Sequence, residues 1–252
     1  MRKFRLTDGL YVFAMNALSL FSGIGGLDIA AEWAGFKTVA FCERDKFCKS
    51  VLAARWPGVP IVDDVKEISG DGFGKLHVLH GGYPCQPFSL AGPRRGHDDD
   101  RHLWPHMLRI VREGKPDWVV GENVRGHVTL GLDAVCDDLE AAGYETRAVV
   151  FPAISVGAHH IRERVFVVAN SKSHAGEFQP GERKDLRDIT SVNGSPWPAC
   201  GDMRGLAPGV PRVGDGIPNR VDRVKALGNA VVPQQAYPIF AAIAETYNVH
   251  SD

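Results

Sequence analysis

The chain has 252 residues, of which 44% are hydrophobic and 23% charged, and its formal net charge is −1. This composition is typical of a soluble globular protein with a sizeable core, and it argues against a disordered chain. The near-zero charge gives no overall sign of nucleic-acid binding, so any surface for nucleic acid must be local.

Short β-rich runs alternate with segments of helical periodicity. We expect strands at 17–21, 38–43, 77–82, 118–124, 146–151 and 164–170, and helices at 26–35, 45–56, 102–114, 132–143 and 234–247. The alternation predicts an α/β fold in which helices cover a sheet. The pattern is lost over 171–222, where eight Gly and six Pro occur without a sustained period. This stretch is interpreted as a long irregular insertion.

The N-terminal segment has the basic start and short apolar run of a signal peptide, but it continues into Ser22 and Gly23 without a cleavage site. No apolar run approaches the roughly 20 residues of a membrane span. The five cysteines are odd in number and never spaced as C-x-x-C, which argues against a disulfide framework and a zinc site. We therefore expect a cytoplasmic protein with no membrane partner and no metal.

The first strand leads into a glycine turn, "LFSGIGGLD" at 20–28. Gly23, Gly25 and Gly26 allow close backbone approach to a ligand at the start of a helix. Glu43 follows about 20 residues later at the end of the next strand, where an acid binds ribose hydroxyls in nucleoside-binding folds. The pattern predicts a nucleoside cofactor, and both a nicotinamide dinucleotide and S-adenosylmethionine are candidates. The spacing G-x-G-G, however, is not the dinucleotide pattern G-x-G-x-x-G.

Cys85 lies between Pro84 and Pro87, after an apolar run and before a long polar loop. A thiol held rigidly at the end of a strand is a candidate nucleophile, and a buried core cysteine is the alternative interpretation. Glu122 and Asn123 close the strand at 118–124. In a parallel sheet these residues would share one cleft with Cys85, although an acid at a strand end also serves as a cap or an ion-pair partner.

Arg162 and Arg164 stand two apart at the start of the last predicted strand, so they share one face of it. Two guanidinium groups on one face suit an anion or a base carbonyl, and paired surface arginines are the alternative. Residues 160–225 hold eleven Lys or Arg against eight Asp or Glu. This local basic excess fits a nucleic-acid surface or a solvated face.

Five motifs occur in order along the chain: "FSGIGG", "GGYPCQPFS", "ENV", "RERVF" and "LGNAVVP". In this order they resemble the DNA cytosine-5 methyltransferases, over nearly all of 18–247 except the irregular stretch. The resemblance implies a Rossmann-like methyltransferase sheet with a small irregular target-recognition insertion. It divides the chain into an N-terminal extension (1–14), a catalytic and cofactor-binding domain (15–170), a reduced target-recognition region (171–222) and a returning C-terminal segment (223–252).

The resemblance also implies that the cofactor is S-adenosylmethionine, with Glu43 on its ribose and Asp64 at its adenine. The implied cofactor-binding residues are Phe21, Gly23, Ile24, Gly25, Gly26, Leu27, Glu43, Arg44, Asp64, Val65, Asn229 and Ala230. Two positions depart from the family pattern. Arg44 stands where a bulky apolar residue usually covers the adenine, and His160 stands where the family usually has glutamine.

For catalysis the resemblance implies that the Cys85 thiolate adds to carbon 6 of a flipped cytosine while Glu122 binds ring nitrogen 3. Arg164 would bind the base carbonyl, and Arg162 would support the thiolate and a backbone phosphate. The loop that follows Cys85 is expected to act as a lid with Gly92 and Gly96 as hinges. The implied substrate-binding residues are Pro84, Gln86, Ser89, Arg94, Arg95, Arg101 and Asn123.

The expected partner is duplex DNA, bound by a monomer, and a cognate restriction endonuclease acting on the same site is a candidate partner. The size of the 171–222 region predicts a short target of about two to four base pairs. Three alternatives stay open: an RNA cytosine-5 methyltransferase, a catalytically idle DNA-binding module, and a nicotinamide oxidoreductase. The last would account only for the glycine turn and Glu43.

Overall fold

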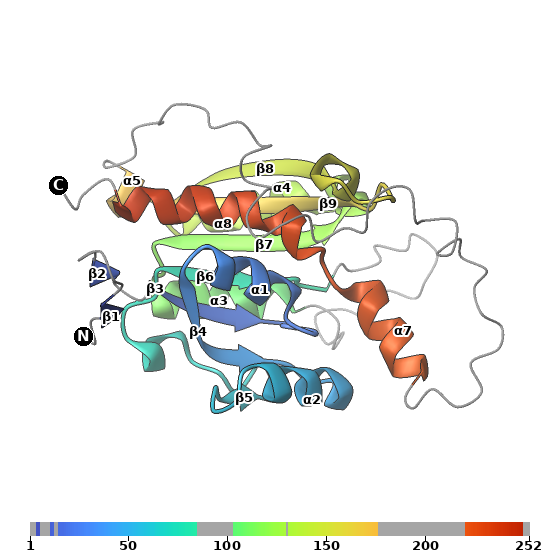
Figure 1. Cartoon of the computed structure of the whole chain (residues 1–252). Helices are drawn as coiled ribbons and strands as arrows, with labels where there is room; N and C mark the ends of the chain where they lie inside the picture. The colour runs from blue at the N-terminus through green and yellow to red at the C-terminus, as the bar shows by residue number, and fades with distance from the viewer. Residues whose placement is uncertain are drawn as a thin grey trace, which may run out of the picture.

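A computed structural model of the chain describes residues 4–5, 11–12, 15–84, 103–129, 131–175 and 220–248. Its centre is a seven-stranded sheet with the order β5-β4-β3-β6-β7-β9-β8 (Figure 1). The strands are β3 (Met15–Leu20), β4 (Phe36–Cys42), β5 (Ile61–Val62), β6 (Val78–Gly81), β7 (Trp118–Val124), β8 (Tyr144–Pro152) and β9 (Glu163–Ser171). A separate antiparallel pair joins β1 (Phe4–Arg5) to β2 (Tyr11–Val12).

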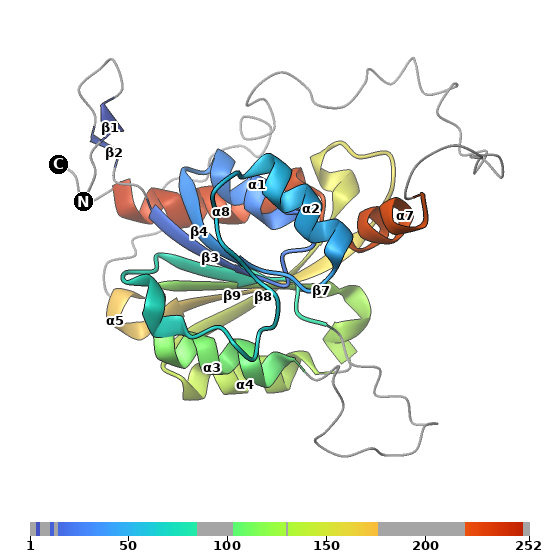
Figure 2. The same ribbon diagram turned by 90° about the horizontal axis from the view of Figure 1, so that it is seen from below.

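The helices form a layer on each face of the sheet. In Figure 2, α1 (Gly26–Trp33) and α8 (Pro233–Asn248) lie on one face, and α3 (Trp104–Gly114) and α4 (Leu132–Ala141) lie on the other. The remaining elements are α2 (Lys46–Arg55), α5 (Lys172–Ala175), α7 (Arg220–Asn229) and the 3₁₀ turns η1 (Gly70–Phe73), η2 (Arg125–Thr129) and η3 (Ala153–Val156).

The alternation of side chains along the strands builds two cores. Val119 of β7 belongs to the core beneath α3 and α4, whereas its neighbours Trp118 and Val120 belong to the core beneath α1 and α8. Phe240 of α8 is fully buried in that second core. Because α8 supplies core residues, the C-terminal segment is an integral part of the domain.

The direction of each strand determines which strand ends lie together at one edge of the sheet. The five strands from β5 to β7 run parallel, so their carboxyl ends lie at one edge of the sheet. β9 runs antiparallel to β7, with Arg164 opposite Val124. The start of β9 therefore meets the carboxyl end of β7 at that same edge.

The α/β fold predicted from the sequence is confirmed, and all six expected strands and five expected helices are present. The sequence reading missed β1, β2 and β5, because runs of two residues carry no periodicity. The expectation that 171–222 is irregular is wrong at both ends of the stretch, where α5 lies and where α7 begins at Arg220. Most of 171–222 lies outside the described residues, so the proposed domain limits stay predictions.

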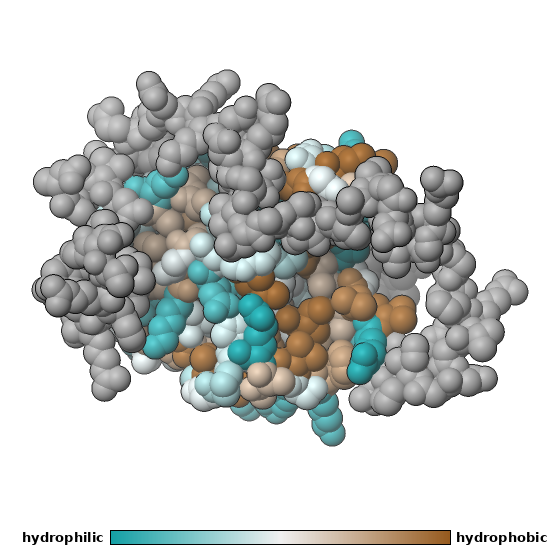
Figure 3. Space-filling model, viewed as in Figure 1, coloured by the Kyte–Doolittle hydropathy of each residue, from teal (hydrophilic) through white to brown (hydrophobic). Residues whose placement is uncertain are grey.

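Helix α7 stands at the rim of the domain. Ala226 is buried, whereas Val221, Val224 and Leu227 expose 79%, 64% and 64% of their surface. Figure 3 shows apolar side chains over this helix at the right of the view.

Among the described residues, the helices are all too short or too polar to cross a membrane.

Candidate active site

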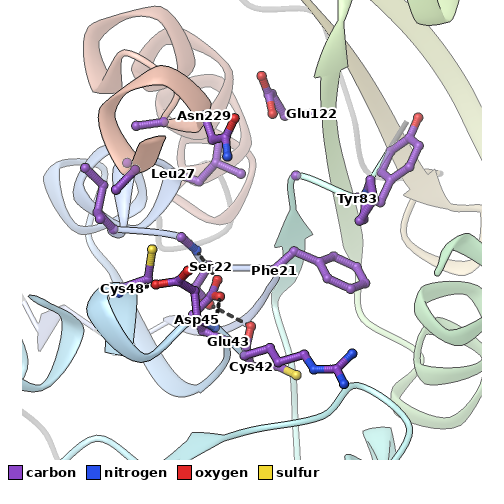
Figure 4. A pocket seen from close by; sticks show the side chains of 18 of the residues that line it. Phe21, Ser22, Leu27, Cys42, Glu43, Asp45, Cys48, Tyr83, Glu122 and Asn229 are labelled. Carbon is purple, nitrogen blue, oxygen red and sulfur yellow. Dashed lines mark hydrogen bonds between the residues drawn. The ribbon is translucent and has the colours of Figure 1, made fainter. Parts of the chain in front are cut away.

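A pocket of about 550 Å³ opens at the carboxyl edge of the parallel strands. Ligands in open α/β sheets bind at this edge. Figure 4 shows side chains around the pocket, among them Phe21, Glu43, Glu122 and Asn229. The lining residues come from segments far apart in the chain, within 21–27, 42–48, 63–66, 82–84, 122–124 and 222–231, together with Leu103 and Arg164.

The glycine turn forms one side of the pocket. Gly23 lines it with a φ of 56°, in the left-handed region that favours glycine. A Cβ on Gly26 would lie 2.6 Å from the carbonyl oxygen of Val231, so the start of α1 touches the C-terminal segment directly. Gly25 packs against Trp56 and is not among the lining residues.

Glu43 joins the glycine turn to the start of α2. Its Oε2 accepts the Gly23 N–H at 2.6 Å, and its Oε1 accepts the Asp45 N–H at 2.7 Å. Asp45 caps α2 by accepting the N–H groups of Phe47 and Cys48. Each Glu43 oxygen has capacity for a further hydrogen bond, which suits the hydroxyls of a ribose.

Two thiols face the same pocket. Burial raises the pKa of both Cys42 and Cys48 to about 12, and the negative charge of Glu43 acts in the same direction. Both side chains are therefore neutral at physiological pH. They act as small apolar wall residues and not as nucleophiles.

Glu122 is a buried carboxyl group in the pocket wall. Burial raises its pKa to about 7, although the charges of Arg164 and Arg162 act in the opposite direction. Arg164 Nε donates to Glu122 Oε1 at 2.8 Å. Glu122 therefore exchanges a proton near neutral pH, as general acid–base catalysis requires.

The residues before Cys85 are fixed by the strand next to them. Asn123 Nδ2 donates to the carbonyl oxygen of Tyr83 at 3.0 Å, and the Tyr83 hydroxyl lies 2.9 Å from His127 Nε2. Tyr83 and Pro84 line the pocket. Cys85 follows them directly but lies outside the described residues.

Arg162 lies one residue before β9 and has a φ of 36°, so strand alternation does not set its direction. Its Nη2 donates to the carbonyl oxygens of Gly228, at 2.8 Å, and Ala230. Arg162 and Arg164 therefore face different partners. The side chain of Arg164 reaches Glu122, and that of Arg162 reaches the C-terminal segment.

The pocket collects most of the residues that the sequence reading assigned to it: Phe21, Gly23, Ile24, Gly26, Leu27, Glu43, Arg44, Asp64, Val65, Pro84, Glu122, Asn123, Arg164, Asn229 and Ala230. Gly25 and Arg162 lie beside it. The described residues do not include Cys85, Gln86, Ser89, Arg94, Arg95 or Arg101.

Asp45, Tyr83 and Lys225 also line the pocket, although the sequence motifs did not assign a role to them. Asp45 carries a recognisable signal, an N-cap residue before a helical period. Lys225 lies 3.3 Å from Asp45, a contact 180 residues apart in the chain that no local pattern predicts. In the described ranges, no group of three or more His, Cys, Asp or Glu could hold a metal ion.

Comparison with known proteins gives consistent matches. The sequence profile of C-5 cytosine-specific DNA methylase matches residues 15–195. The type II methyltransferase M.BsuRI of Bacillus subtilis is 31% identical over 229 residues, with 77% of this chain and 48% of that protein covered. M.AquIA of Picosynechococcus is 36% identical over 183 residues, with 64% and 74% covered.

Among solved structures, a protein of an E. coli prophage described as a DNA modification methyltransferase superimposes with a TM-score of 0.56. The two sequences are 27% identical, and the match covers 71% of this chain and 55% of that one. The chain thus spans about half the length of M.BsuRI and of this structure.

Proposed function

Since the chain belongs to the family of C-5 cytosine-specific DNA methylases, we propose that it transfers a methyl group from S-adenosylmethionine to carbon 5 of cytosine in duplex DNA. The main support for the proposal is the environment of Glu122. This buried carboxyl group, with a pKa raised to about 7, lies in the wall of a pocket built from the family's motifs and is held by Arg164.

The pocket fits the proposed cofactor in its donors and acceptors. Glu43 offers acceptor capacity for two ribose hydroxyls, and the adenine is proposed to contact Asp64 and Val65, which line the same pocket. Gly23 leaves open space, because a Cβ built on it would meet nothing within 4 Å. The bound cofactor would supply an electrophilic methyl group on its sulfonium.

Cytosine carbon 5 is a weak nucleophile, so the proposed reaction begins with covalent activation. The Cys85 thiolate adds to carbon 6, and Glu122 donates its proton to ring nitrogen 3. Carbon 5 becomes the nucleophilic end of an enamine and takes the methyl group. A base then takes the carbon 5 proton, the carbon–sulfur bond breaks to release the thiolate, and ring nitrogen 3 returns its proton to Glu122.

The target carbon lies inside the stacked duplex, so the proposal includes flipping of the base into the pocket, as is general for DNA methyltransferases. The relatives are type II methyltransferases, which supports DNA as substrate and a restriction endonuclease as a functional partner. A monomer acting in the cytoplasm, without a metal ion, completes the proposal. The target-recognition role of 171–222 and the lid role of the loop after Cys85 belong to it as well.

The direct test is incubation of the purified chain with tritiated S-adenosylmethionine and either duplex DNA or transfer RNA. We expect label in the duplex DNA, at carbon 5 of cytosine. Label in transfer RNA alone would replace the proposal with the RNA alternative. Absence of label together with salt-sensitive DNA binding would favour an idle binding module.

The covalent step is tested at Cys85. We expect Cys85→Ser to abolish methyl transfer and to leave binding of S-adenosylhomocysteine nearly unchanged, because the thiolate is needed only for addition to the base. Wild-type protein should also form a covalent complex with duplex DNA carrying 5-fluorocytosine, since fluorine cannot leave as the proton does. A Cys85→Ser protein with wild-type turnover would refute the mechanism.

A further inference from the structure

The segment at 228–231, which comprises the last two residues of α7 and the first two of the link to α8, is held from two sides. On one side Val231 packs on Gly26, and a Cβ built on Gly26 would lie 2.6 Å from the carbonyl oxygen of Val231. On the other side Arg162 Nη2 donates to the carbonyl oxygens of Gly228 and Ala230. These two carbonyls flank Asn229, which lines the pocket together with Ala230 (Figure 4).

Arg162 is itself fixed by the first turn of α8. Gln235 is fully buried, and its Nε2 donates to the carbonyl oxygen of Arg162 at 2.9 Å and to that of Phe151 at the end of β8. Arg162 Nε is buried and makes no hydrogen bond within the described residues. The backbone and the guanidinium of Arg162 therefore both contact the C-terminal part of the chain.

We propose that Arg162 is a positioning residue for the cofactor pocket, whose guanidinium holds the 228–231 segment against the start of α1 so that Asn229 and Ala230 complete the wall. The inference rests on the proposed function, because it assigns this wall to S-adenosylmethionine. It differs from the role implied by the family resemblance, in which Arg162 supports the thiolate and a DNA phosphate. The geometry supports the positioning role, since Arg162 Nη2 donates to the two backbone carbonyls on either side of Asn229.

The positioning role and the phosphate-binding role predict losses of affinity for different ligands. Arg162→Met keeps most of the side-chain length and removes both charge-assisted hydrogen bonds, so we expect it to weaken binding of S-adenosylhomocysteine by about tenfold or more without DNA present. Affinity for a duplex oligonucleotide should change by less than about twofold, because no phosphate contact is removed. In steady-state assays the KM for S-adenosylmethionine should rise more than kcat falls.

Arg162→Lys tests the same bonds with a milder change, because an ammonium group donates to carbonyl oxygens but lacks the planar fork. Its affinity for S-adenosylhomocysteine should lie between those of wild type and Arg162→Met. Arg125→Met is the matched control, since Arg125 is an exposed arginine that pairs with Glu163 on the surface. Thermal unfolding of each ligand-free variant shows whether the fold is intact, and Arg162→Lys carries the test if Arg162→Met does not fold.

Calorimetry with S-adenosylhomocysteine and anisotropy with labelled duplex DNA separate the outcomes. Unchanged cofactor affinity in folded Arg162→Met or Arg162→Lys overturns the inference, and weakened DNA binding in the same variant assigns Arg162 to the phosphate instead. Equal weakening in Arg125→Met also overturns it, because the effect would then be one of general charge. If wild-type protein binds no S-adenosylhomocysteine, the proposed function itself fails, and the inference fails with it.

Discussion

Asp28 is a buried ionisable residue in the first turn of α1, directly after the glycine turn. Ser19 Oγ and Thr38 Oγ1 each donate to its carboxyl oxygens at 3.0 Å, and His80 Nε2 lies 3.6 Å from Oδ1. Burial raises the pKa of Asp28 to about 7, and burial lowers the pKa of His80 to about 3. At neutral pH His80 is therefore uncharged, and Asp28 is close to its titration midpoint.

The burial of Asp28 and His80 makes the stability of the folded state depend on pH. An acid whose pKa is raised by folding stabilises the folded state fully below its unfolded pKa, and that contribution is lost as pH rises through the folded value. For Asp28 the loss runs from about pH 4 to about pH 7. The contribution of His80 has the opposite sign, because a depressed base destabilises the fold as pH falls below its unfolded value near 6.5.

We expect Asp28→Asn to become more stable relative to wild type as pH rises. An amide resembles the protonated acid and has no charge to bury, so the difference in unfolding free energy should grow by about 3 kcal/mol between pH 5 and pH 8. Urea unfolding at several pH values measures it. Asn in place of the exposed Asp137 is the control and should follow the wild-type profile. A pH-independent difference for Asp28→Asn would contradict an ionisable group with a raised pKa.

At the scale of elements, three pieces of structure meet at Glu43. Glu43 directly follows β4, and its two carboxylate oxygens accept hydrogen bonds from the backbone of the glycine turn and from the backbone at the start of α2. If the same carboxylate also accepts ribose hydroxyls, it couples ligand binding to the packing of these elements. Charged hydrogen bonds of this kind contribute about 1.5–3 kcal/mol each.

We therefore expect Glu43→Ala to weaken S-adenosylhomocysteine binding by about an order of magnitude or more. Calorimetry measures the affinity, and near-ultraviolet circular dichroism checks that the glycine turn and α2 remain packed. Glu67→Ala is the matched control, because Glu67 is exposed and is not among the lining residues. Equal affinities in Glu43→Ala and wild type would refute the assignment to the ribose.

Some features of these elements could be predicted from the sequence and others could not. The position of Glu43 was predictable, because a strand end about 20 residues after a glycine turn is a local pattern with a known geometry. The direction of the Arg162 side chain was not, because a φ of 36° breaks the strand alternation on which the expectation rested. The contact of Gly26 with Val231 depends on how α8 packs, and a pairing across about 200 residues has no local signal.

At the scale of the whole molecule, the pocket joins both ends of the domain. The glycine turn and α1 line the cavity through 21–24 and 26–27, the C-terminal segment lines it through 228–231, and α1 packs on α8. A ligand in this cavity would contact residues near both ends of the described chain. Its binding should therefore stabilise the N-terminal and C-terminal parts together.

Hydrogen exchange tests this coupling. We expect saturating S-adenosylhomocysteine to slow amide exchange both at the start of α1 and across 226–235, because a ligand that bridges two segments suppresses the local opening of each. Amides of α4, on the opposite face of the sheet from α1 and α8, serve as the internal reference and should slow only as far as global unfolding is suppressed (Figure 2). Protection confined to the glycine turn would show that the C-terminal wall does not contact the ligand, and it would also remove the basis for placing Asn229 and Ala230 in the cofactor site.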